Sequence, residues 1–99
     1  MLVHSVFFWL REDLTSEQRQ NFASALHTLS TIESIHAVYI GTPAPTPPRP
    51  VIDASYDFAL TVIFSRSEDH DRYQEDPVHQ QFISENKHLW TKVQIYDAA

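Results

Sequence analysis

The residues best suited to chemistry lie in the stretch from Tyr73 to Asp97. His79 follows Pro77 closely, and an imidazole with a reference pKa of about 6.5 can exchange a proton at neutral pH. Tyr73 offers a phenol hydroxyl that can hold a developing negative charge on oxygen. This pattern makes His79 a candidate general base, Tyr73 its catalytic partner, and Asp97 a group that could orient the imidazole.

Each of these residues also has an ordinary structural interpretation. His79 could hydrogen-bond the backbone and hold the start of a helix against a sheet. Tyr73 could be a packed aromatic residue whose hydroxyl is satisfied. His4 lies on the core-directed face of a predicted strand, so it is either a satisfied core histidine or a polar group in a pocket.

Other polar clusters do not indicate a metal or a cofactor. His70 lies beside Glu68, Asp69 and Asp71, but acidic residues are favoured at a helix N-terminus by the helix dipole. The chain has one glycine and no cysteine, and it lacks H-E-x-x-H and phosphate-binding motifs. We therefore expect no metal site and no cofactor, and the usual motifs of kinases, nucleotide-dependent enzymes and zinc proteases are missing. The histidines without a partner at ligand spacing are His27, His36 and His88.

Composition predicts one globular domain over residues 1–99, since 42% of the residues are hydrophobic and 20% are charged. A net charge of −6 disfavours nucleic acids and anionic membranes as partners. The start of the chain resembles neither a signal peptide nor a membrane span. Together with the absence of cysteine, these features predict a cytoplasmic protein.

Patterning predicts four strands and a split second helical region. Thr15 and Gln18 form a capping box that opens the first helix, and Ser65 with Glu68 suggests another. Asp76 and Pro77 read as the cap and first residue of a further helix, with an apolar helical stripe that reaches Trp90. The strands are expected at 2–10, 35–40, 56–64 and 93–97.

One long connection separates the two middle strands. Gly41 is expected to make a turn with positive φ at the end of the second strand. Five prolines fall in residues 42–50, which we expect to be extended and exposed, because proline lacks a donor and opposes helix. This segment is either a simple hairpin connection or a binding loop that lies on a neighbour.

The element order predicts a ferredoxin-like βαββαβ fold of the α+β class, a four-stranded antiparallel sheet with helices on one face. Both faces of the first and third strands are apolar, and the chain has no further element to cover the second face. We therefore expect a homodimer with opposed sheets, which would form a dimeric α/β barrel. The interface residues predicted on this basis are Val3, Phe7, Trp9 and Ile63.

With these elements placed, the chain resembles the stress-responsive A/B barrel (Dabb) family of dimeric α+β barrels. The resemblance covers nearly the whole chain. It rests on the opening V-H-S-V-F-F-W, the Y-D-F-A-L strand, the Y-x-x-x-P-x-H-x-x-F cassette of residues 73–82, the later Trp90 and the terminal Y-D.

The family includes a plant polyketide cyclase, olivetolic acid cyclase, in which a His and a Tyr of this cassette carry an aldol-type ring closure. The resemblance implies the same roles for His79 and Tyr73, although Phe58 stands where the cyclase has a histidine. It also implies a ligand pocket between helices and sheet. The pocket residues predicted in this way are His4, Val6, Phe8, Phe22, Phe58, Phe82, Trp90 and Asp97.

Three functions follow from these observations. The first is a non-catalytic dimeric barrel of unassigned role that binds a small apolar or aromatic ligand. The second is a cofactor-free cyclase or lyase with His79 as general base. The third is a cofactor-free monooxygenase, which rests on similarity of fold to the antibiotic-biosynthesis monooxygenases.

Overall fold

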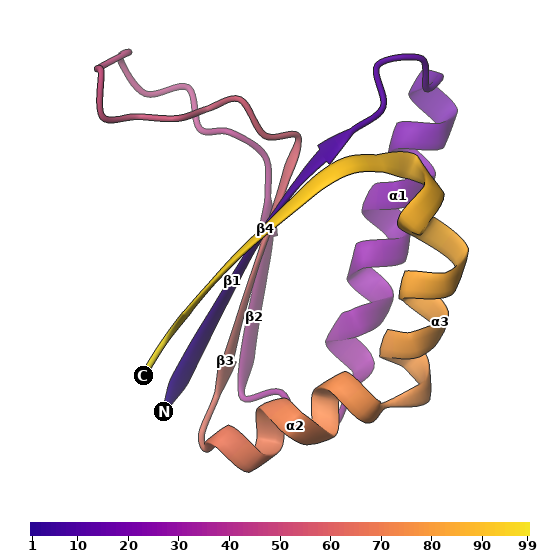
Figure 1. Cartoon of the computed structure of the whole chain (residues 1–99), viewed down its shortest axis with the longest axis vertical. Helices are drawn as coiled ribbons and strands as arrows, with labels where there is room; N and C mark the ends of the chain where they lie inside the picture. Colours follow the sequence, from indigo (N-terminus) through magenta and orange to yellow (C-terminus); the bar gives the residue numbers. More distant parts are fainter.

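The computed structural model describes all of residues 1–99 and shows an antiparallel sheet with the helices α1 and α3 on one face (Figure 1). The strand order across the sheet is β2-β3-β1-β4. This is the predicted ferredoxin-like α+β arrangement. The strands are β1 (Leu2–Leu10), β2 (Ala37–Gly41), β3 (Phe58–Phe64) and β4 (Trp90–Ala98).

The helices are α1 (Ser16–Thr28), α2 (Ser67–Glu75) and α3 (Pro77–Asn86). Side-chain caps mark the starts of α1 and α3. Thr15 and Gln18 form the predicted capping box at α1. Asp76 caps α3 by accepting a hydrogen bond of 2.8 Å from the Val78 amide, with Pro77 as the first helical residue. None of the helices has the length and apolar character needed to cross a membrane.

Two predictions about helix ends were wrong. Ser65 does not cap α2, which begins after Arg66 and has no side-chain cap. Trp90 does not extend the helical stripe, because α3 ends at Asn86, a short 3₁₀ turn follows, and Trp90 opens β4. The Asn86 amide donates to the Phe82 carbonyl at 2.9 Å, and Trp90 already pairs with Leu10 of β1. Strand pairing therefore overrides the helical periodicity.

The glycine turn was also predicted wrongly. Gly41 has no positive φ; it is the last residue of β2 and pairs with Ala59. A Cβ at this position would lie 3.2 Å from Cε1 of Tyr39, so glycine here makes room for a neighbouring ring. Strand limits also differ slightly, since β2 and β3 each begin two residues later than expected and β4 begins three residues earlier.

The core lies between the helices and the inner face of the sheet. On β1 the inward residues His4, Val6, Phe8 and Leu10 are buried, and they alternate with half-buried outward residues. The other buried core residues are Phe22, Leu26, Leu29, Ile32, Leu60, Val62, Phe64, Tyr73, Phe82 and Leu89. The burial of β1 therefore follows the period of two that is typical of a strand.

The proline-rich connection between β2 and β3 contains no helix or strand, as predicted, and it extends beyond the end of the sheet (Figure 1). Its C-terminal end is tied to β1. The Trp9 indole donates to the Ser55 hydroxyl at 3.0 Å, and the Asp57 carboxylate accepts from the Leu10 amide at 2.7 Å and from Arg19 at 3.1 Å. These contacts connect the segment to the strand and to α1.

The two termini lie at the same end of the sheet (Figure 1). Val3 of β1 pairs with Ala98 of β4 in the antiparallel ladder.

The cap at α3 can be tested by mutation. Asp76→Ala should lower the free energy of unfolding by about 1 kcal/mol, because the Val78 amide loses its acceptor. Urea unfolding at neutral pH measures the loss. Glu75→Ala, a neighbouring exposed change with no side-chain hydrogen bond, is the control, and equal losses in the two variants would show that the cap contributes nothing.

Candidate functional site

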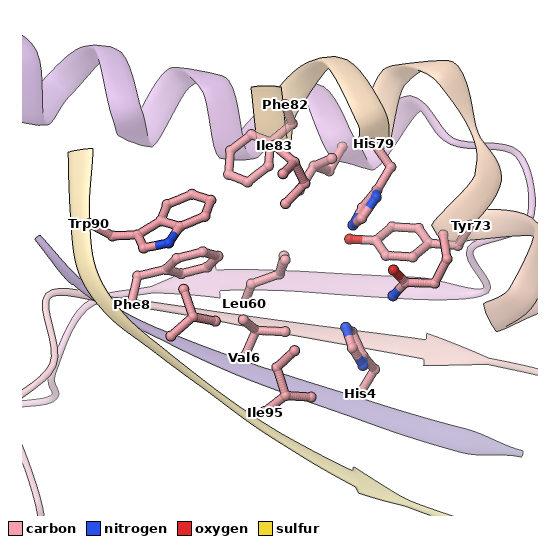
Figure 2. A pocket seen from close by; sticks show the side chains of 13 residues that line it. His4, Val6, Phe8, Leu60, Tyr73, His79, Phe82, Ile83, Trp90 and Ile95 are labelled. Atoms are coloured by element: carbon pink, nitrogen blue, oxygen red, sulfur yellow. The ribbon is translucent and has the colours of Figure 1, made fainter. Parts of the chain in front are cut away.

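A cavity of about 120 Å³ lies between the sheet and the helices. Figure 2 shows side chains from β1, β3 and β4 on one side and from α2 and α3 on the other. Ten of its 13 lining residues are hydrophobic. The lining consists of His4, Val6, Phe8, Leu29, Leu60, Tyr73, Gln74, His79, Phe82, Ile83, Trp90, Val93 and Ile95.

The polar groups gather at one end of this cavity. His4, Tyr73 and His79 lie together there, whereas Trp90, Phe8 and Phe82 close the opposite end (Figure 2). A ligand in the cavity would therefore meet hydrogen-bonding groups at one end and aromatic rings at the other.

His79 is held in the first turn of α3 by the Asp76–Pro77 helix start. Its Nδ1 atom is buried and has no hydrogen-bond partner. Burial lowers the pKa of His79, and the nearby His4 and, to a smaller extent, His70 act in the same direction. The backbone of Gln74 lies close enough to the ring to oppose this shift, as does Asp76, but the Gln74 contact lacks the geometry of a hydrogen bond to Nδ1. The imidazole is therefore neutral at pH 7 and able to accept a proton.

Tyr73 lies at the end of α2 with only 1% of its surface exposed. Its ring centroid is 4.7 Å from that of His79, and its hydroxyl points toward the His79 ring (Figure 2). Burial raises the pKa of Tyr73 well above its ordinary value. The phenol therefore stays protonated at neutral pH and acts as a hydrogen-bond donor.

Asp97 does not orient His79, contrary to the expectation from sequence. Nδ1 of His4 lies 2.5 Å from Oδ1 of Asp97. The cause is the strand register, in which His4 of β1 lies directly opposite Asp97 of β4. The carboxylate therefore fixes the second histidine of the polar end.

Five of the eight expected pocket residues line the cavity. Three do not. Phe22 is fully buried behind the wall and packs against Phe8 with ring centroids 5.3 Å apart. Phe58 packs against Phe22 at 5.5 Å, and Asp97 lies beyond His4.

Several lining residues were not anticipated from sequence. Leu60 shares the inward face of β3 with Phe58, and Ile83 follows His79 by one helical turn. Strand and helix periodicity could therefore have identified both as lining residues. Gln74 had no such signal, because its position at the end of α2 depends on where that helix stops. The other lining residues missed were Leu29, Val93 and Ile95.

Comparison with solved structures shows the same fold in several proteins of low sequence identity. A Dabb family protein from Mesorhizobium loti has 23% identity and a TM-score of 0.80, covering 99% of this chain and 94% of its own. A hydroxynitrile lyase from Passiflora edulis has 17% identity and a TM-score of 0.81, with 98% and 90% covered. A dimeric ferredoxin-like protein of unknown function from Thermobifida fusca has 18% identity and a TM-score of 0.79, with 99% and 89% covered.

No curated protein matches the chain. The family model for the stress responsive A/B barrel domain, Dabb, matches residues 2–99. This match includes both strands that carry His4 and Asp97 and the helical cassette that carries Tyr73 and His79. The chain belongs to the Dabb family.

Proposed function

We propose that the cavity is an active site for proton transfer next to a carbonyl group, with His79 as general base. The observation that carries this proposal is the buried Nδ1 of His79, which has no hydrogen-bond partner although the ring lines a cavity. A purely structural histidine would be expected to satisfy both ring nitrogens. The neutral imidazole beside a protonated phenol supplies a base and a donor together.

The proposed step uses only these side chains. His79 takes a proton from the carbon next to a carbonyl, so the C–H bond breaks and its electron pair forms the enolate. Tyr73 donates a hydrogen bond to the enolate oxygen. In a cyclase the enolate carbon then attacks a second carbonyl, and the resulting alkoxide recovers the proton from His79. In a lyase the same steps run in reverse, so the C–C bond breaks and the enolate carbon recovers the proton from His79.

Cavity size restricts the substrate. An engineered apolar cavity of about 150 Å³ accommodates benzene, so 120 Å³ suits a ketone smaller than benzene. The aromatic residues at the far end of the cavity would contact its alkyl part. A non-catalytic ligand-binding module is the alternative that the same cavity would support, and it predicts binding without turnover.

We also propose that the protein is a homodimer joined through the outer face of its sheet. Val3, Phe7, Trp9 and Ile63 are half-buried on that face, and the neighbouring Tyr39 and Tyr96 are 73% and 63% exposed. A second copy would remove this apolar surface from water at about 25 cal/mol per Å². The Thermobifida fusca protein with this fold is described as dimeric.

Catalysis can be followed by NMR as exchange of α-protons for deuterium in acetone or butanone. The native protein should accelerate exchange, and His79→Gln should abolish the acceleration because the base is lost. Tyr73→Phe should slow exchange by about 10²-fold, the typical cost of losing one oxyanion donor. The exposed change His88→Gln should leave the rate unchanged.

Two outcomes of the exchange experiment would contradict the catalytic proposal. Saturable binding of these ketones without exchange would favour the ligand-binding module. Equal exchange in His79→Gln and the native protein would place the base elsewhere.

The lowered pKa of His79 predicts a dependence of stability on pH. Below about pH 6.5 the unfolded chain binds a proton at this histidine, whereas the folded chain resists protonation until its lower pKa is reached. The free energy of unfolding should therefore have its full value above about pH 6.5. It should decrease as the pH falls from there toward the lower pKa of His79 in the folded state. Other titratable groups surround the ring and can add to the pH dependence of stability; they are His4, His70, Asp76 and Tyr73. The contribution of His79 is therefore measured as the difference between the native protein and a His79 variant.

Denaturant unfolding at pH 7.5 and 5.5 measures this effect. The loss on acidification should be smaller in His79→Gln than in the native protein, since glutamine does not titrate. The control is His36→Gln, an exposed change that should preserve the native loss. An identical loss in His79→Gln and the native protein would show that His79 does not contribute.

The dimer can be tested by light scattering after size exclusion. Phe7→Glu should give a monomer or an unfolded chain, because its cross-strand partners Gln94 and Ala59 carry no charge and an unpaired charge would be buried in the interface. Ser24→Glu, on the exposed side of α1, should leave the dimer intact. A native protein that is monomeric at low micromolar concentration would overturn the proposal.

A further inference from the structure

A second cluster of side chains lies next to the polar end of the cavity. It consists of His4 on β1, His70 on α2 and Asp97 on β4. One potential ligand atom from each residue lies within 4.8 Å of the others. We propose that these three residues bind a divalent transition-metal ion such as Zn²⁺, Co²⁺ or Fe²⁺, which the sequence did not lead us to expect.

The chemistry of the donors selects this class of ion. Two imidazole nitrogens and one carboxylate oxygen suit borderline transition metals, whereas Ca²⁺ and Mg²⁺ favour sites built from oxygen ligands. Three protein ligands also leave coordination positions open for water or another small ligand. The ion would thus be bound in an open site.

The spacing needs only local side-chain movement. Ligand bonds of about 2.0–2.2 Å place neighbouring ligand atoms roughly 3 to 3.5 Å apart. The contact between His4 and Asp97, now 2.5 Å, must therefore widen, and His70 must move closer. The His70 and Asp97 side chains are 20% and 44% exposed, so both can rotate, while the buried His4 provides a fixed ligand. The exposed side also gives the ion a path of entry.

The surroundings of His70 fit a ligand role. Its Nδ1 lies 3.8 Å from Oδ1 of Asp71, and its Nε2 lies 3.3 Å from the Gln74 amide nitrogen. The separation from Asp71 is too long for a hydrogen bond, but the nearby carboxylate favours a proton on Nδ1 over one on Nε2, which leaves the Nε2 lone pair available for a metal ion. The ion would take the place of the weak amide contact.

Packing alone accounts for this cluster only in part. The hydrogen bond to Asp97 explains the position of His4 without a metal. His70 is different, because its ring lies 5.0 Å from the His4 ring and 5.5 Å from Phe64 but has only the long contact to Gln74 as a side-chain hydrogen bond. A shared ion gives all three side chains a common partner.

Co²⁺ titration of the untagged, metal-free full chain tests the proposal, since its visible absorption reports coordination directly. We expect saturation at one ion per chain, and competition by Zn²⁺, which should also raise the melting temperature because it binds the folded state. His70→Gln and Asp97→Asn should each weaken Co²⁺ binding at least tenfold. The exposed change His88→Gln should leave the affinity unchanged.

Three results would overturn the proposal. They are the absence of saturable Co²⁺ binding, equal affinity in the native, His70→Gln and Asp97→Asn proteins, and an equal loss in His88→Gln, which would indicate surface binding. His79→Gln should retain the ion. This variant separates the metal site from the proposed proton-transfer function, because each can fail while the other holds.

Discussion

The apolar side chains on both faces of β1 are the constraint on which the other features of this protein depend. β1 lies between β3 and β4, so its backbone is paired on both sides. Its inward residues form the floor of the cavity, and its outward residues Phe7 and Trp9 form much of the opposite face. A one-residue shift in register would exchange these two sets of side chains, so the site and the proposed interface are fixed by the same pairing.

The break between α2 and α3 provides the second requirement of the site. Pro77 disfavours helical geometry in Asp76, and Asp76 has an extended conformation between the two helices. Tyr73 therefore lies near the end of one helix and His79 in the first turn of the next. Leaving the buried Nδ1 of His79 without a partner carries a cost of about 1–3 kcal/mol. The packing around the ring must offset that cost.

Sequence patterns predicted features that depend on local chemistry or on strand alternation. The cap at Asp76, the inward face of β1 and the βαββαβ order could all be read without coordinates. Features that depend on pairing between strands distant in sequence could not be predicted in this way. The helical spacing of Trp90 did not indicate that this residue would pair with Leu10 and begin β4. The contact between Asp97 and His4 depends on the register of β1 and β4, which the sequence does not show.

The same limit applies to the cavity. Phe22 and Phe58 have the size and position of pocket residues in the sequence, but they fill the space behind the wall. Which aromatic ring lines a cavity and which ring supports it depends on interdigitation in the core, a property of packing rather than of periodicity.

The adjacent chain ends have a topological consequence. Because β1 and β4 pair up to Val3 and Ala98, a short linker could join the termini without disturbing the ladder, and new termini could be opened in the exposed proline-rich connection. The resulting circular permutant would begin with β3 and end with β2. The strands that carry His4 and Asp97 would then form a covalently continuous hairpin, β4 followed by β1. In the native chain order they are the two most distant elements.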